Sequence, residues 1–270
     1  MISDLKKHYG LDYVPFGKDI QPGSIHKHPS QQQAIARLTW CIAEREIAVL
    51  TGDVGAGKSV ALRTVTARLD PATHVTIYVH NPSIGYVGLY SAIVNGLGGV
   101  PKYRHADLIP QAADLLAEQE VERGRTAVLV VDEAHLLGND QLEDLRLLTH
   151  AEMDSRSHMT VILAGQPILR RKLKQGLFAA LDQRITTRCA IDGMTYSDTK
   201  SYIAHHLELA GRTSSLFTDD AISVIHKQSR GLPRAVNNIC RLGLIASLAT
   251  GKELIDIAAA NQAAKEYTAE

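Results

Sequence analysis

Short apolar runs alternate with segments of helical periodicity through the first two thirds of the chain. The runs predict buried strands, because strands covered on both faces lack the polar alternation of a half-exposed strand. They lie at residues 47–51, 75–79, 127–131 and 160–164, and a fifth strand is expected at 185–191. Helical spacing between them covers residues 31–43, 60–65, 84–97, 109–123 and 141–149. This alternation predicts an α/β fold, a parallel sheet with helices on both faces.

The strand pattern ends near residue 195, and only helical patterns follow. They cover residues 196–210, 218–228, 234–249 and 254–267. Residues 1–29 are rich in Pro, Gly and His, and this composition indicates an extended arm that covers another part of the protein. We therefore expect an N-terminal arm at 1–29, an α/β core at 30–192 and a small all-α lid domain at 193–270.

Composition narrows the class of protein without fixing its function. The chain has 270 residues, 45% hydrophobic and 21% charged, which is typical of a soluble globular protein. The 29 basic and 29 acidic residues balance, so any surface for nucleic acid must be a local one. Three distant cysteines and 12 scattered histidines lack disulfide or zinc-ligand spacing. With no signal-peptide core and no apolar run near the roughly 20 residues that cross a bilayer, we expect a cytoplasmic protein without a membrane partner.

A glycine-rich motif joins the first predicted strand to the helix that follows it. It fits the pattern Gly-x-x-x-x-Gly-Lys-Ser/Thr, whose backbone N–H groups and helix N-terminus surround a nucleotide's phosphates. Lys58 would reach the outer phosphates, and the Ser59 hydroxyl would ligate Mg²⁺. The expected nucleotide-binding residues are Gly52, Asp53, Val54, Gly55, Ala56, Gly57, Lys58, Ser59 and Val60.

A pair of carboxylates ends the third apolar run. Asp132 is placed to hold Mg²⁺ through water, and Glu133 to polarise a water molecule for attack on the terminal phosphate. The alternative is a strand that merely ends in acids at the protein surface. The phosphate loop about 75 residues upstream favours the metal and water roles.

Three further polar residues fall where hydrolysis would need them. Gln166 follows the fourth strand and could contact the attacking water, or it could be a turn residue. Arg184 precedes the fifth strand and could be an arginine finger for a neighbouring subunit, or a surface ion-pair partner. Arg234, in Gly-Leu-Pro-Arg, could fold back onto the nucleotide, although Pro in a first helical turn is ordinary.

In this order, the motifs resemble those of the AAA+ ATPases across essentially the whole chain. The phosphate loop and Asp132-Glu133 look like the two Walker motifs. Gln166 matches the sensor-1 position, where many relatives carry Asn, Thr or Ser, and Arg184 and Arg234 match the arginine-finger and sensor-2 positions. The resemblance implies a P-loop NTPase, an ATP hydrolase that uses ATP and Mg²⁺.

Softer similarities narrow the resemblance to the ExeA/TniB-type subgroup. They include His8-Tyr9-Gly10-Leu11, Leu163-Ala164-Gly165-Gln166-Pro167 and Leu181-Asp182-Gln183-Arg184-Ile185. This subgroup includes the TniB, TnsC, IstB and phage Mu B kinds of ATPase, which partner DDE transposases. It implies a homo-oligomeric ring or helical filament on duplex DNA that regulates target selection and transposase activation in DNA recombination.

DNA contact is expected at a basic loop between the second and third strands. There Lys102, Tyr103 and Arg104 follow a proline, with Tyr86 nearby. Arg156 and His158 form a second candidate. No sequence-specific reader is evident, so binding should be largely independent of DNA sequence. A solvated charge cluster is the alternative.

Three other functions remain open. The first is an ExeA-like secretion or assembly ATPase that works without DNA. The second is a replication or signalling switch that binds ATP and hydrolyses little, and the third is a small-molecule kinase. The secretion relatives carry a transmembrane helix after the ATPase, and this chain ends soon after the lid, so we expect the transposition function.

Overall fold

The computed structural model describes residues 2–17, 22–82, 85–149 and 157–268 of the chain. The chain divides into two compact units. One is an α/β unit made of residues 29–54 and 58–191. The other, the helical unit, is made of residues 1–28, 55–57 and 192–270.

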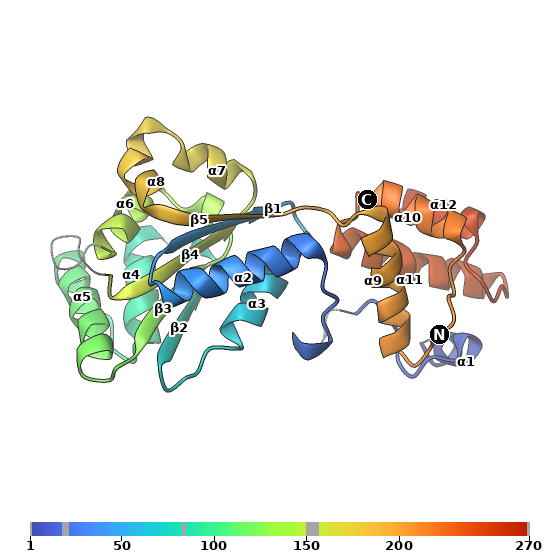
Figure 1. The fold of residues 1–270 in the computed structure, drawn as a ribbon, viewed down its shortest axis with the longest axis horizontal. Coiled ribbons are helices and arrows are strands. Elements are labelled where there is room, and N and C mark those ends of the chain that lie inside the picture. The colour runs from blue at the N-terminus through green and yellow to red at the C-terminus, as the bar shows by residue number, and fades with distance from the viewer. Residues whose placement is uncertain (1, 18–21, 83–84, 150–156, 269–270) are drawn as a thin grey trace. The chain divides into compact units, whose positions relative to one another are not determined.

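The α/β unit is built on one five-stranded parallel sheet (Figure 1). The strands follow the order β2-β3-β4-β1-β5. Their bounds are β1 Ile47–Gly52, β2 His74–Val79, β3 Thr126–Val131, β4 Met159–Gly165 and β5 Ile185–Ile191. Every residue of the three central strands is buried, whereas the edge strands β2 and β5 mix buried and more exposed positions. This burial explains the uninterrupted apolar runs of the central strands.

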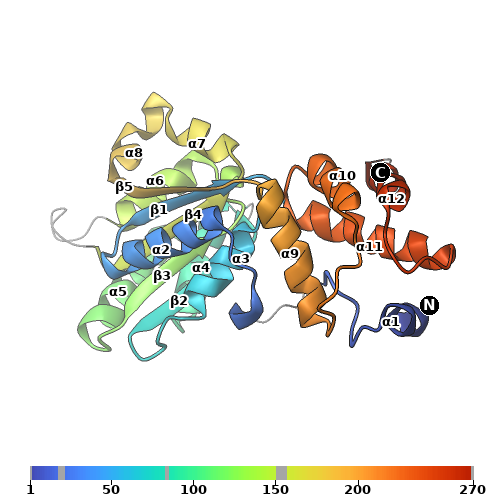
Figure 2. The same ribbon diagram turned by 45° about the vertical axis from the view of Figure 1, so that its right-hand side comes forward.

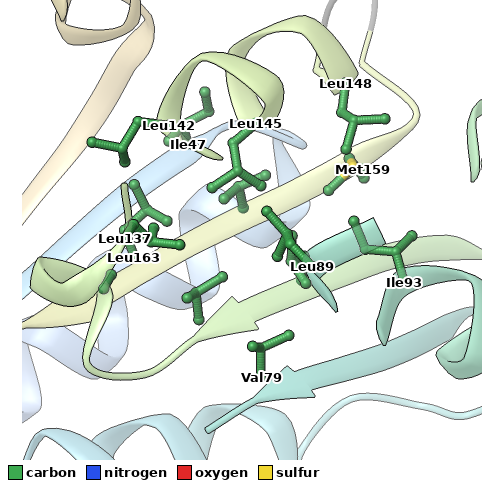
Figure 3. Close-up of a cluster of buried hydrophobic side chains, with 14 of the residues drawn as sticks. Ile47, Val79, Leu89, Ile93, Leu137, Leu142, Leu145, Leu148, Met159 and Leu163 are labelled. Carbon is green, nitrogen blue, oxygen red and sulfur yellow. The ribbon is translucent and has the colours of Figure 1, made fainter. Parts of the chain in front are cut away.

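Helices cover both faces of this sheet. On one face, α4 (Gly85–Gly96), α5 (His105–Val121), α6 (Asn139–Leu148), α7 (Ile168–Leu173) and α8 (Ala179–Arg184) enclose a continuous hydrophobic core. Figure 3 shows Leu89 and Ile93 of α4 and Leu142, Leu145 and Leu148 of α6 gathered over strand residues of this core. The second face carries α2 (Pro29–Ala43), which contacts β1, β4 and β5, and α3 (Lys58–Thr66), which contacts α2 and β1.

The predicted fold class is confirmed, with differences at short helices. The helices α7 and α8 were not predicted, since six residues hold too few turns to show a periodic apolar stripe. The helix α5 begins at His105, four residues before the predicted start at 109, and contains Pro110 within its first two turns. Among the described residues, the connections of this unit include the 3₁₀ turns η3 (Ala134–Leu136) and η5 (Gly176–Phe178).

The helical unit has a core of its own. Four helices follow β5 in the chain: α9 (Tyr196–Leu209), α10 (Asp219–Ser229), α11 (Pro233–Ala249) and α12 (Ile257–Thr268) (Figure 2). They bury a single cluster that includes Ile203, Leu207, Ile222, Ile239 and Leu244. The helix α11 is amphipathic along its whole length, and its buried face contacts both α10 and α12.

The prediction that residues 1–29 are extended is wrong at residues 2–9, which are helical, but the segment does cover other residues as expected. Residues Ile2–Tyr9 form the helix α1, and Pro22–Ser24 form the 3₁₀ turn η1. Leu5 and Tyr9, one helical turn apart, join Phe16 in the core of the helical unit. The Tyr9 hydroxyl donates a hydrogen bond to the Leu244 carbonyl at 3.0 Å. The Pro and Gly residues interrupt the regular structure of this segment, but they do not prevent its apolar side chains from packing in the core.

Candidate active site

Three neighbouring strands bring the predicted site residues to one edge of the sheet. The strands β3, β4 and β1 are adjacent, with Val131 beside Leu163 and Thr51 beside Gly165. The residues that end or follow these strands therefore lie at the same carboxyl edge. In open parallel sheets, ligands bind in the crevice outside this edge.

The glycine-rich loop leaves β1 at this edge. Gly55 and Gly57 have φ angles of 81° and 102°, which glycine adopts without the strain that a Cβ would cause. Lys58 is the first residue of α3, and its side chain is buried. Its Nζ donates to the carbonyl oxygens of Gly52 at 2.9 Å and Asp53 at 3.1 Å. The ammonium group is thus held over the loop, beside the positive end of a helix dipole.

Asp132 follows β3 and is held by three donors. The Ser59 hydroxyl donates to its Oδ2 at 3.1 Å, and the Tyr78 hydroxyl donates to the same atom at 2.9 Å. The backbone N–H of Glu133 donates to Oδ1 at 2.9 Å. Partial burial and hydrogen bonding to Asp132 raise the pKa of Tyr78 to about 12, so its hydroxyl stays protonated at neutral pH. A hydroxyl and a carboxylate at this separation are hard oxygen ligands of the kind that Mg²⁺ prefers.

Glu133 differs from its neighbour in exposure and in backbone conformation. Its side chain is 43% exposed, whereas Asp132 is buried. Its backbone is left-handed, with φ 51° and ψ 35°, which costs on the order of 1–3 kcal/mol for a residue with a side chain. The His135 Nδ1 lies 3.4 Å from Glu133 Oε2. An exposed carboxylate next to these candidate metal ligands can contact a water molecule that the buried Asp132 cannot reach as freely.

Gln166 is the first residue after β4 and is half-buried. Gly165, just before it, passes so close to the η3 turn that a Cβ would lie 3.1 Å from the His135 backbone nitrogen. The end of β4 therefore packs directly against the turn that follows Glu133. This contact keeps Gln166 on the same edge as Asp132 and Gly52.

Arg184 lies at the amino ends of the strands, opposite the carboxyl edge at which the phosphate loop leaves β1. It ends α8, and the next residue, Ile185, pairs with Ile47 at the start of β1. At about 3.3 Å per residue, the length of β1 separates this pair from Gly52 by roughly 17 Å. Arg184 therefore does not share an edge with the phosphate loop of its own chain.

Arg234 belongs to the helical unit. It is exposed in the first turn of α11, after Pro233. Its backbone N–H donates at 3.3 Å to the carbonyl of Gly55, which groups with the same unit.

The candidate DNA-contacting loop lies between two helices rather than at a strand end. Lys102, Tyr103 and Arg104 join α4 to α5, and all three are exposed, Tyr103 by 98%. The Gln111 side chain shapes this loop, accepting from the Lys102 N–H at 3.0 Å and donating to the Val100 carbonyl at 2.9 Å. The remaining candidates are dispersed. Tyr86 is in α4, His158 Nδ1 lies 2.6 Å from Glu120 Oε2, and Arg156 lies outside the described residues.

Tyr78 is the site residue that the sequence did not reveal. It lies in a predicted strand, but the sequence contains no signal that orders β2 next to β3. Only the register, with Tyr78 beside Val130, brings its ring to the end of β3.

Comparison with known proteins agrees with this geometry. Residues 42–173 match a family model described as an AAA domain. The structure resembles Cdc6p from Pyrobaculum aerophilum, with a TM-score of 0.71 and 19% identity over 93% of this chain and 70% of that chain. The chain has the fold of an AAA+ P-loop NTPase. The ORC1 protein of Aeropyrum pernix, solved in complex with DNA, is similar at a TM-score of 0.68 and 15% identity, over 90% of this chain and 66% of that one.

A curated relative extends over most of the chain. General secretion pathway protein A of Aeromonas hydrophila is 33% identical over 251 residues, which are 92% of this chain and 45% of that protein. This chain thus spans less than half of the relative's length. None of the helices in the described part of the chain has the length and apolar character required to cross a membrane.

Proposed function

We propose that this AAA+ chain is a Mg²⁺-dependent ATP hydrolase. The observation that carries the proposal is the contact between Ser59 and Asp132 at 3.1 Å, next to the buried Lys58. Ser59 and Asp132 would hold Mg²⁺, which would neutralise phosphate charge. Lys58 would leave the loop carbonyls to stabilise negative charge on the outer phosphates.

Glu133 is assigned the water-activating role. It would accept a proton as the water oxygen bonds to the terminal phosphorus and the bond to the bridging oxygen of ADP breaks. Its exposure and its place beside Asp132 support this assignment. Gln166, on the adjacent strand end, would donate to or orient the same water molecule.

Arg184 would complete the active site of a second copy of the chain. Its place on the opposite edge of the sheet supports action in trans, because it cannot reach its own phosphate loop along the strand. Hydrolysis would then depend on assembly, as in other enzymes that receive an arginine from a partner. We expect Arg184→Ala and Glu133→Gln proteins to be inactive alone and to regain part of the activity when mixed. No regain on mixing, under conditions where the two variants co-assemble, would contradict action in trans.

For the biological setting, a secretion or assembly ATPase has the stronger support. The 33% identity to General secretion pathway protein A extends over 92% of this chain. This function, which the sequence left as an alternative, requires no DNA. The partner would be another component of the assembly that ATP hydrolysis drives.

DNA-dependent regulation of transposition is the second candidate. It is supported by the exposed basic loop at Lys102–Arg104 and by the likeness to ORC1, which was solved with DNA. It predicts a DDE transposase as partner and a ring or filament of this chain on duplex DNA.

One experiment separates the two candidates. Phosphate release from ATP is measured with and without duplex DNA of random sequence, while electron microscopy records any assembly on the DNA. Hydrolysis that DNA does not change, with no assembly on it, favours the secretion candidate. Stimulation that is lost in Lys102→Ala/Arg104→Ala but kept in the surface control Lys227→Ala/Lys265→Ala favours the DNA candidate, since both pairs remove two positive charges.

A further inference from the structure

Tyr78 gives the Asp132 carboxylate a side-chain hydrogen bond from outside the two nucleotide motifs. Its hydroxyl donates to Asp132 Oδ2 at 2.9 Å, the same oxygen that accepts from Ser59 at 3.1 Å. We propose that Tyr78 is a positioning residue for the magnesium site, where its hydroxyl fixes the Asp132 carboxylate toward a metal-bound water. The proposal rests on the Mg²⁺-dependent ATP site described above.

The fold directs Tyr78 to this carboxylate. Neighbouring residues of a strand point to opposite faces of the sheet. Ile77 and Val79 are buried in the core beneath α4, so Tyr78 projects on the other face, toward the start of α3 and Ser59. The register of β2 with β3 sets Tyr78 beside Val130, two residues before Asp132.

The hydrogen bonds leave the carboxylate with little freedom. An ionised carboxylate has about four acceptor sites. Tyr78 and Ser59 occupy two on Oδ2, and the Glu133 N–H occupies one on Oδ1. About one site remains, on Oδ1, for a metal-bound water. Without the Tyr78 hydroxyl, Asp132 gains a second free site and can rotate away from the orientation that suits the metal.

The test uses Tyr78→Phe, which removes only the hydroxyl of a half-exposed ring. Binding of a fluorescent ADP analogue is titrated with Mg²⁺ and repeated in EDTA. Groups that orient metal ligands are worth 10–100-fold in metal affinity at buried sites, and Tyr78 is 51% exposed, so we expect about 3–10-fold more Mg²⁺ for half-maximal enhancement. Affinity in EDTA and thermal unfolding in EDTA should match the wild type. At saturating Mg²⁺ the hydrolysis rate should recover to within about twofold, which a catalytic role would not allow.

Tyr13→Phe, at a 48% exposed ring of the helical unit, is the matched control and should leave the Mg²⁺ titration unchanged. A Tyr78→Phe titration that overlays the wild type would overturn the role of Tyr78 while leaving the ATP site intact. Wild-type protein whose nucleotide binding ignores Mg²⁺ would instead overturn the proposed function, and the Tyr78 proposal with it.

Discussion

The internal structure of each of the two units is held together in a different way. In the α/β unit, backbone geometry places the candidate site residues, because Gly52, Asp132 and Gln166 lie at the ends of adjacent parallel strands. In the helical unit, side-chain packing anchors the N-terminal segment, since the Phe16 ring stacks on His206 at 5.1 Å between centroids. Residues at strand ends can be located from the spacing of motifs along the sequence, whereas two stacked rings such as Phe16 and His206 have no characteristic spacing.

The polar groups of the two units are also treated differently. Asp132 is buried with a hydrogen-bond donor at each carboxylate oxygen. His206 is buried against Phe16 and Tyr202, and its Nε2 has no hydrogen-bond partner among the described residues. Stability of the helical unit should therefore depend on keeping that imidazole neutral, whereas the α/β site depends on keeping charges in place.

Removal of the Phe16 ring should have the largest effect on the stability of the helical unit. Phe16 is 2% exposed, so truncation to Ala should cost about 3–5 kcal/mol in the local stability of the helical unit. Its φ of 63° is left-handed, which costs a residue with a Cβ about 1–2 kcal/mol. Phe16→Gly should therefore be less damaging than Phe16→Ala by about 1 kcal/mol, although it removes more atoms.

Amide hydrogen exchange of α1 and α9 measures this local stability without assuming a single unfolding transition for two units. Equal losses for the two variants would show that the backbone of Phe16 stores no strain. Unchanged protection in both would contradict the anchoring role of the ring.

A change of pH should have the next largest effect on the stability of the helical unit. Burial, with smaller contributions from His205 and His26, lowers the pKa of His206 to about 4, below its ordinary value near 6.5. The unfolded chain therefore takes up a proton before the folded one. The stabilising contribution is complete above about pH 6.5 and is lost as the pH falls through about 4, with a loss of about 2 kcal/mol at pH 5.

Burial also lowers the pKa values of His26 and His28. The nearby Asp198 carboxylate offsets only part of this effect, so both residues add to the same trend. Protection factors for α9, corrected for intrinsic exchange, should fall between pH 7.5 and pH 5. His206→Leu should flatten this dependence, and the exposed control His80→Asn should not. A pH profile identical in wild type and His206→Leu would show that His206 is not the group responsible.

The smallest expected effect is at the start of α9. Thr195 Oγ1 accepts from the Asp198 N–H at 3.2 Å, and the Asp198 carboxylate accepts from the Thr195 N–H at 3.1 Å, a capping box. Thr195→Ala should cost about 1 kcal/mol, within the range of 0.5–2 for lost N-caps. Thr195→Ser, which keeps the oxygen, should cost less, and exchange in the first turn of α9 measures both. Equal costs for Ala and Ser would exclude the cap as the cause.

Much of the α/β unit was readable from the sequence for a physical reason. Buried parallel strands leave uninterrupted apolar runs, and a phosphate loop needs glycines and a lysine at fixed spacing, so neither depends on distant residues. The contact of Tyr78 with Asp132 could not be read, because 54 residues separate them and only the strand order joins them.

The helix in the N-terminal segment and its packing partners could not be predicted, for the same reason. Leu5, Tyr9 and Phe16 look like isolated apolar residues among Pro and Gly, and their burial depends on helices that come almost 200 residues later. Composition describes local chain flexibility, but it does not report which distant surface accepts a ring. Short helices such as α7 and α8 escaped notice because six residues cannot display a periodic stripe.

The proposed function makes the carboxyl edge of the sheet a Mg²⁺-dependent site of ATP hydrolysis. The most direct test measures ATP binding and phosphate release by wild type and Glu133→Gln, with Lys58→Ala as the binding-deficient control. We expect Glu133→Gln to bind Mg²⁺-ATP as tightly as wild type and to release phosphate at least about 100-fold more slowly, in line with loss of a general base. Phosphate release by Glu133→Gln at the wild-type rate would contradict the proposed function.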